Sequence, residues 1–386
     1  MNKPIKTFFI ILVILSLVPG YLLFKWVFQP KKELNILILD KTVPTFLREN
    51  HRSFNWILTH EKYVKPDKKR YNYIKDYFGF FPLKPQRSKQ YEIKRIRLSK
   101  VIELADSFDM AYFTDTYGVY FNDWYKGNNR TRRSRKIYGG TNNNDYLFLK
   151  EMKNRKKLFI GEYDILAYPT DLLERTKTEN LFDLKWTEWL GKYFSSLDSI
   201  KNPELPKWIM DIYRKQYHKP WTFKHGGIVF VSFNNSVVVL EDKKDLDFEV
   251  PYIYTTEYGQ KKFGLPYKVA FPSWFEVVDP GNNKVVSFFK IHVNDMGDSI
   301  LTSNSIPNQF PAVLESSTEY PHFYFAGNFA NNPIYMRSAY FSGYEKFCQK
   351  IGVPFLQKKR YFYWHFYQPL MTHILDQYYA ERKGGK

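Results

Sequence analysis

The segment KLFIGEYDILAYPTDLLE, residues 157–174, predicts how the chain is organised. Its apolar run at residues 158–160 is typical of a strand that is buried on both faces. Residues 161–164 (GEYD) then place two carboxylates where that strand would end. Because ligands of open α/β sheets bind at the carboxyl ends of strands, a site is expected here first. A core strand with a polar exit is the alternative interpretation.

Two further apolar runs of this kind come earlier in the chain. Residues 34–39 (LNILIL) end at Asp40, and the run at residues 110–114 ends at Asp115. Helical patterns separate these runs. The alternation predicts an α/β fold, with a mostly parallel sheet flanked by helices on both faces.

The second half of the chain carries signals of antiparallel strands. Asn234 and Asn235 separate two apolar runs and predict a hairpin, because Asn tolerates positive φ. The runs at residues 269–278 and 284–293 flank a DPGNN turn and predict another. The sheet is therefore expected to carry β-hairpin extensions, with a last buried strand at residues 323–326.

Three segments of this half have apolar residues at helical spacing. The first is residues 186–197, where the pattern predicts packing in the core. The second is residues 206–217, a short amphipathic helix. The third begins near Pro369, in the C-terminal tail.

The first 32 residues are interpreted as a transmembrane signal anchor. Residues 8–28 are apolar enough and long enough to cross a bilayer as a helix. No small-residue cleavage site follows them. The hypothesis is a single-pass protein of the cell membrane whose remaining residues lie outside the cytoplasm.

Domain boundaries follow from composition. No Gly/Ser-rich or Pro-rich linker divides the rest of the chain, so one α/β domain is expected at residues 33–348. A basic, Tyr-rich segment at about 62–97 is interpreted as an insertion in it. Residues 349–386 form an aromatic, helical C-terminal extension.

The charge of the chain favours an anionic partner. The 386 residues carry a formal net charge of +19, and 19% of them are aromatic. Besides the membrane, a carbohydrate polymer or an anionic lipid suits such a surface. Nucleic acid is not expected, because the basic residues are scattered and match no nucleic-acid-binding motif. Compositional bias toward Lys is a second explanation of the charge.

The densest basic run is KGNNRTRRSRK, residues 126–136, with six Lys or Arg in eleven residues. Such a run is either a solvated loop or a contact for an anion or a lipid headgroup. The sequence leaves both interpretations open.

Several kinds of chemistry are excluded by composition. Cys348 is the only cysteine, which rules out internal disulfides and thiolate zinc sites. His218 and His225 lie seven residues apart, and no His or carboxylate cluster has the spacing of metal ligands. No glycine fingerprint for phosphates or dinucleotides is present. No metal and no cofactor are therefore predicted.

Five stretches together carry a resemblance to a known family. They are LNILILD (34–40), DMAYFTDTYG (109–118), KLFIGEYD (157–164), FPAVLE (310–315) and FYFAGNFANNP (323–333). Their order resembles the class I glutamine amidotransferase-like fold, a flavodoxin-like group. The resemblance implies a flavodoxin-like sheet over residues 34–348.

The same resemblance bears on catalysis. The family places a nucleophilic Cys in an elbow after the strand, whereas this chain has Gly161, Glu162 and Tyr163 there. Cys348 lies far downstream. Glutamine hydrolysis is therefore not expected, and the catalytic residues stay unknown.

The candidate ligand-binding residues follow the predicted strands. We expect Asp115, Tyr117, Glu162 and Tyr163 to gather in one cleft, with Asn328 at its margin. The hypothesis is a membrane-anchored, non-catalytic amidotransferase-like domain that binds a ligand or partner at the cell envelope. The alternative is a hydrolase of cell-surface carbohydrate that uses Asp115 and Glu162 as paired carboxylates.

Overall fold

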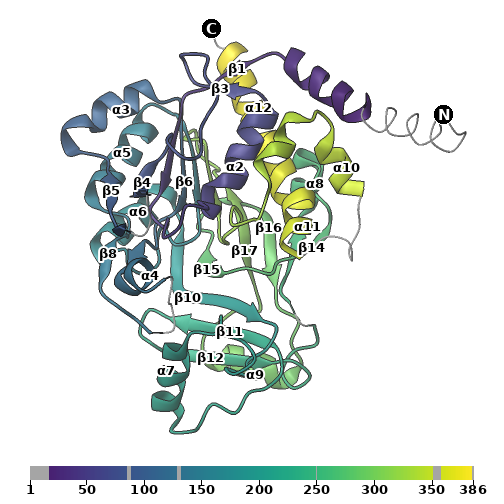
Figure 1. Ribbon diagram of the computed structural model, residues 1–386. Coiled ribbons are helices and arrows are strands. Elements are labelled where there is room, and N and C mark those ends of the chain that lie inside the picture. Colours follow the sequence, from purple (N-terminus) through teal and green to yellow (C-terminus); the bar gives the residue numbers. More distant parts are fainter. Residues whose placement is uncertain (1–16, 85–87, 128–131, 249, 351–357, 385–386) are drawn as a thin grey trace, which may run out of the picture.

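One large mixed sheet forms the centre of the molecule (Figure 1). The computed structural model describes residues 17–84, 88–127, 132–248, 250–350 and 358–384. Within them, the strands of this sheet lie in the order β14-β13-β16-β17-β18-β9-β6-β2-β4-β5. Their bounds are β2 (Ile36–Asp40), β4 (Phe78–Pro82), β5 (Tyr91–Lys94), β6 (Met110–Asp115), β9 (Leu158–Glu162), β13 (Tyr252–Thr255), β14 (Lys268–Ala270), β16 (Lys284–Lys290), β17 (Gln309–Glu315) and β18 (His322–Phe325).

The sheet is not mostly parallel. The strands β4, β2, β6, β9 and β18 are parallel neighbours, and every residue of β2, β6, β9 and β18 is buried as their apolar runs predicted. Five of the nine pairings in the described sheet are nevertheless antiparallel. The predicted mostly parallel flavodoxin-like sheet is therefore wrong. Short connections such as residues 316–321 explain this, because a parallel pairing needs a longer crossover.

Helices cover both faces of the parallel strands. Tyr112 and Phe113 are successive residues of β6, so their side chains point to opposite faces. The Tyr112 ring contacts Phe54 of α2 (Glu49–His60), and the Phe113 ring contacts Phe148 of α5 (Asn143–Asn154). In Figure 1, α12 (Gln368–Gly384) accompanies α2, while α3 (Val101–Ser107) and α6 (Leu172–Phe182) accompany α5.

A second, smaller sheet lies below the large one in Figure 1. Its order is β12-β11-β10-β15, with bounds β10 (Lys185–Phe194), β11 (Gly227–Ser232), β12 (Val237–Glu241) and β15 (Phe275–Asp279). The predicted Asn hairpin is confirmed, because β11 and β12 pair antiparallel and Asn235 has a φ of 60°. The predicted amphipathic helix is also confirmed as α7 (Lys207–Tyr217), beside this sheet.

The expected core helix at residues 186–197 is instead the strand β10. Its register shifts between Trp186 and Leu190, where Glu188 has a φ of 72°. Such a bulge inserts an extra residue and breaks the strict alternation of a strand. The apolar residues therefore recur at a spacing that imitates a helix.

The hairpin predicted around the DPGNN turn is wrong as well. β15 pairs with β10 in the small sheet, whereas β16 pairs with β13 and β17 in the large one. Asn282 and Asn283 of the turn donate hydrogen bonds to Asp183. The turn is held there and carries the chain from one sheet to the other.

Smaller elements complete the fold. Two short sheets pair β1 (Lys32–Glu33) with β3 (Tyr63–Val64) and β7 (Val119–Tyr120) with β8 (Lys136–Tyr138). Further α-helices among the described residues are α4 (Phe121–Tyr125), α8 (Glu257–Phe263), α9 (Asp295–Ser303), α10 (Tyr344–Lys350) and α11 (Lys358–Phe362). The segment at about 62–97, interpreted as an insertion, supplies β3, β4 and β5.

The transmembrane prediction is overturned. In the described part of the chain, no helix combines the length and the apolar character that crossing a membrane requires. The structure describes the end of the predicted anchor as a helix at residues 17–28, while residues 1–16 lie outside the described residues. Trp26 of this helix is buried against Lys62 and Tyr340 of the same chain. The single-pass, membrane-anchored hypothesis is therefore not kept.

Replacing Gly79 with Ala should destabilise the edge of the sheet. Gly79 pairs with Asp40 at a φ of 138°, and an added Cβ would overlap the carbonyl oxygen of Asp40. We expect a loss of about 2–4 kcal/mol in the free energy of unfolding, measured by urea denaturation. Gly264→Ala is the control, because Gly264 also has a positive φ but has nothing within 4 Å. It should cost only about 1–2 kcal/mol. Equal losses in the two variants would contradict the proposed clash.

Candidate functional site

The carboxyl ends of β2 and β6 lie at the point where the order of the parallel strands reverses. From β2 the chain adds β4 on one side, and then β6, β9 and β18 on the other. Asp40 and Asp115 are register partners at this edge. Ligands of α/β sheets bind at such a reversal, so this edge is the first candidate.

Asp115 is enclosed by hydrogen-bond donors. It is 3% exposed. The Thr42 hydroxyl donates to Oδ1 over 2.5 Å, and the Asn50 amide donates to Oδ2 over 3.0 Å. The backbone N–H of Tyr117 donates to Oδ1 over 2.8 Å. The Asp115 carboxylate therefore ties the loop between β2 and α2 to the end of β6.

Two buried ion pairs lie beside Asp115. The Lys41 Nζ lies 2.5 Å from Asp145 Oδ2 and also donates to the carbonyl of Gly140. The His51 Nδ1 lies 2.6 Å from Asp40 Oδ2, and its Nε2 lies 2.7 Å from the carbonyl oxygen of Tyr73. Both ring nitrogens of His51 therefore lie within hydrogen-bond distance of an oxygen atom. Lys41 and Asp145 form a buried pair of opposite charges.

Glu162, at the end of β9, is fully buried. The Tyr112 hydroxyl donates to Oε1 over 2.5 Å, and the N–H of Ala330 donates to Oε2 over 3.0 Å. The Tyr367 hydroxyl lies 2.8 Å from that of Tyr112. Burial raises the pKa of the Glu162 carboxyl to about 8, against these hydrogen bonds, and the charge of Asp115 raises it further. The group is therefore largely protonated at neutral pH.

The other predicted site residues lie around these two. Tyr163 is buried, which raises the pKa of its hydroxyl, and the charges of Asp164 and Asp115 add to the shift. The half-buried Tyr117 ring lies 4.9 Å from that of Tyr120. The buried Asn328 donates its backbone N–H to Trp274, beside the small sheet.

The edge is therefore an interior polar network. The charge of Asp115 raises the pKa of both Glu162 and Tyr163, so Asp115 lies near both side chains. Asp115 and Glu162 are at most 3% exposed, so a ligand does not reach them in this conformation. Sequence alone did not indicate that the aromatic C-terminal extension would cover Glu162.

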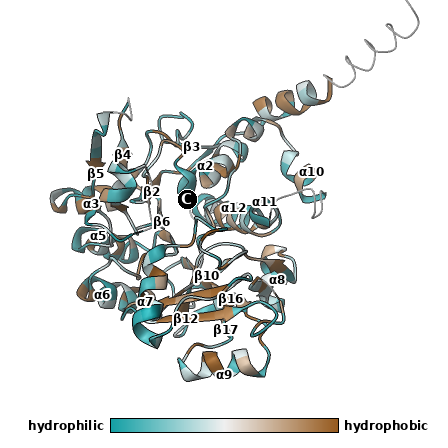
Figure 2. Ribbon diagram, turned by 60° about the horizontal axis from the view of Figure 1, so that its bottom comes forward, coloured by the Kyte–Doolittle hydropathy of each residue, from teal (hydrophilic) through white to brown (hydrophobic). Residues whose placement is uncertain are grey.

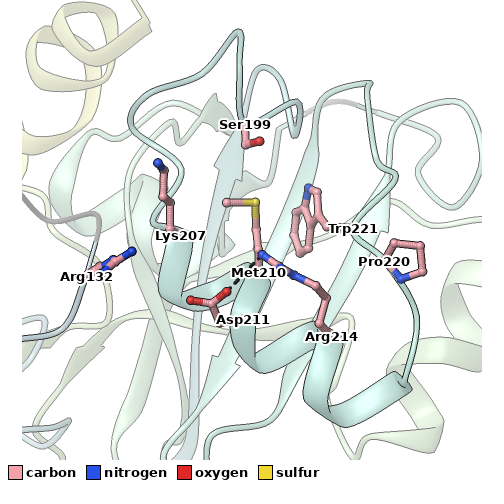
Figure 3. Close-up of a pocket in the computed structure, with 8 residues that line it drawn as sticks. All are labelled: Arg132, Ser199, Lys207, Met210, Asp211, Arg214, Pro220 and Trp221. Atoms are coloured by element: carbon pink, nitrogen blue, oxygen red, sulfur yellow. Dashed lines mark ion pairs between the residues drawn. The ribbon is translucent and has the colours of Figure 1, made fainter.

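An open cavity lies elsewhere, between α7 and the basic loop (Figure 3). Its volume is about 580 Å³, within the usual range of ligand pockets. It is lined by Arg132, Ser199, Lys207, Met210, Asp211, Arg214, Pro220 and Trp221. We call it the α7 pocket.

Three cations and one carboxylate set the charge of the α7 pocket. Arg132, Lys207 and Arg214 are exposed, and Arg214 pairs with Asp211 over 3.0 Å. The lining therefore has a net charge of about +2 if all four groups are ionised. Trp221 adds an aromatic ring, whose Nε1 donates to the carbonyl of Leu197 and so points away from solvent.

The sequence pattern of α7 explains this arrangement. Ile209 and Met210 are buried against the small sheet. Lys207, Asp211 and Arg214 recur at intervals of four and three, which places them on one exposed face. In Figure 2, α7 is largely teal, whereas strands of the small sheet beside it are brown. The helix thus turns its charged face to the pocket.

The opposite wall is held by α4. The Asn122 amide donates to the carbonyl of Arg132, and its backbone N–H donates to the Ser134 hydroxyl. The Phe121 N–H donates to the carbonyl of Arg135. These hydrogen bonds hold Arg132, Ser134 and Arg135 of the basic run in place beside α7. The basic run and the amphipathic helix are each visible in the sequence, but no pattern in it indicates that they meet.

A second cavity, of about 450 Å³, lies between β18 and α12. Its two cations are already paired: Lys156 with Glu319, and Arg382 with Asp109. Among the described residues, it therefore offers an anionic ligand fewer available positive charges than the α7 pocket does. In the described ranges, no group of three or more His, Cys, Asp or Glu residues could hold a metal ion.

Replacing Glu162 with Gln should change how stability depends on pH. A carboxyl whose folded pKa is about 8 keeps its proton while the unfolded chain, near its ordinary pKa, releases it. Stability conferred by this proton is present below about pH 4.5 and is lost as the pH rises to about 8. Glu162→Gln should remove a slope of up to about 1.4 kcal/mol per pH unit.

Urea denaturation at pH 5, 7 and 9 measures that slope. Glu276 is also buried with a pKa of about 8, so part of the pH dependence should remain in the variant. Glu103→Gln is the control, because Glu103 is exposed and pairs with Lys100 at the surface. An unchanged slope in Glu162→Gln would contradict the protonated state of Glu162.

Comparison with known proteins adds no functional information. No protein-family model matches the chain, and no curated protein matches it. A solved structure that does match is that of a ThuA-like protein from Bacteroides uniformis. It shares 7% sequence identity, with 78% of this chain and 83% of that chain covered, at a TM-score of 0.32.

Proposed function

We propose that this chain is a binding protein for acidic carbohydrate, and that the α7 pocket is its site. The observation that carries the proposal is the combination of Arg132, Lys207 and Arg214 with the ring of Trp221 around one open cavity. The candidate residues Asp115, Tyr117, Glu162, Tyr163 and Asn328 have a supporting role, because they shape the sheet edge.

An acidic sugar offers a partner for each kind of group in the pocket. A carboxylate on the sugar accepts charge-assisted hydrogen bonds from Arg and Lys side chains. The apolar face of the ring can pack on Trp221. Asp211 and Ser199 can accept hydrogen bonds from sugar hydroxyls, which donate as well as accept. An all-cationic pocket would lack acceptors for those hydroxyls.

Binding without hydrolysis is better supported than the hydrolase alternative. A glycosidase needs two carboxyl groups that reach the scissile bond. Asp115 and Glu162 are buried and engaged by Thr42, Asn50 and Tyr112. We also infer that the resemblance to the amidotransferase-like family, if it reflects descent, excludes its thiol chemistry, because the elbow carries no Cys or Ser.

Titration calorimetry with galacturonic-acid oligomers tests the proposal. The wild-type chain should bind the oligomers, and it should bind their methyl esters at least tenfold more weakly, because esterification removes the charge and keeps the ring. Lys207→Gln and Arg214→Gln should each weaken binding about tenfold, the effect of about 1.4 kcal/mol. Higher salt should weaken binding further.

A charge-matched control is available on α8. Lys261 is exposed. Within the described part of the chain, its one ion pair is with the exposed Glu257. Lys261→Gln removes one positive charge, as each pocket variant does, and should leave the affinity unchanged. Equal affinity for the acid and for its methyl ester would overturn the proposal. So would cleavage of the oligomers by the wild-type chain, if the Glu162→Gln variant no longer cleaved them.

A further inference from the structure

A second pairing of a cation with an indole ring lies beside the α7 pocket. The guanidinium carbon of Arg133 lies 4.4 Å from the centre of the Trp208 ring. Arg133 is exposed and Trp208 is half-buried, so the pair lies at the surface. Cation–π contacts of this kind are strongest with Trp.

Each member of this pair is next in sequence to a residue that lines the pocket. Arg132 lines the pocket, and Arg133 is the next residue of the same loop. Lys207 lines the pocket, and Trp208 is the next residue of α7. Successive helical residues are about 100° apart around the axis. Trp208 is therefore turned about 100° from the pocket-lining Lys207, and it contacts Arg133 there.

Arg133 is held in place while most of its donors stay available. One terminal nitrogen donates to Asn235 Oδ1 over 2.5 Å, in the turn between β11 and β12. A guanidinium group has five N–H donors. The contact with Asn235 and the stacking on Trp208 thus fix the plane of the group and leave donors for an anion.

We propose that Arg133 and Trp208 form a second subsite for the next acidic unit of a sugar chain, so that the site takes an oligomer rather than a free monosaccharide. This inference rests on the proposed function. Arg132 and Arg133 are successive cations of one loop, and each serves a different subsite. Two adjacent negative charges on one ligand suit that arrangement.

A nucleic-acid strand also combines repeated charges with rings that can stack. The structure favours the sugar chain because Asp211, which lies among the cations of the pocket, is an acceptor for hydroxyl donors. Each sugar unit carries several such hydroxyl groups, whereas the phosphodiester backbone of a DNA strand carries none. The test therefore compares binding of the sugar chain with binding of single-stranded nucleic acid.

Affinity as a function of ligand length tests the second subsite. Titrations of the full chain with galacturonic acid, its dimer and its tetramer should show at least tenfold tighter binding of the dimer than of the monomer. Arg133→Gln should remove that gain and leave the affinity for the monomer unchanged. Trp208→Phe should reduce the gain in part, because a smaller ring still packs there.

Matched variants separate this subsite from the pocket. Arg214→Gln removes a cation from the pocket and should weaken binding of monomer and oligomers alike. Arg133 does not contribute to the apolar cluster under α7, so Arg133→Gln decides the question even if Trp208 variants unfold. Circular dichroism of each variant checks the fold.

The contradictory results are distinct. Equal affinity for monomer and dimer, or a length gain that persists in Arg133→Gln, would overturn the second subsite and leave the proposed function standing. Absence of binding to every acidic sugar would overturn both. Tighter binding of single-stranded DNA than of the tetramer, weakened by Arg133→Gln, would replace the sugar chain with a nucleic-acid strand.

Discussion

Buried charges at the carboxyl ends of β2 and β6 must be paired, and the rest of the site follows from that constraint. Removing an ion from water costs several kcal/mol unless an opposite charge or donors compensate it. Lys41 pairs with Asp145, the His51 ring lies within hydrogen-bond distance of Asp40, and Thr42 and Asn50 donate to Asp115. The side chains that would otherwise face a ligand are therefore occupied by one another.

Because the carboxyl edge of the large sheet is closed, the open cavity lies beside the small sheet instead. Glu162 is covered by Tyr112, Tyr367 and the Ala330 backbone, so its carboxyl group contacts protein rather than solvent. Exposed cations and half-buried indole rings occur instead where α7 meets the loop that carries Arg132 and Arg133. Two segments distant in sequence, around Arg132 and around Lys207, there form one wall each of an open cavity.

Local sequence patterns predicted single elements better than pairings. The apolar run at residues 158–160, the Asn hairpin and the amphipathic helix α7 are all read from a few neighbouring residues, and the structure contains them. The bulge at Glu188 was not predictable, because its positive φ depends on the pairing of β10 with β15. Strand order led us to expect Asp115 and Glu162 near one another, but the burial of Glu162 involves Tyr367, some 200 residues further on.

The central claim is that ligands bind beside α7 because the sheet edge is closed by its own charges. The most direct measurement is a crystal structure of the full chain with galacturonic-acid tetramer bound. The account predicts electron density for the sugar between Trp221 and Trp208, with Asp115 and Glu162 still buried. A sugar bound against Asp115 and Glu162, with the α7 pocket empty, would contradict it.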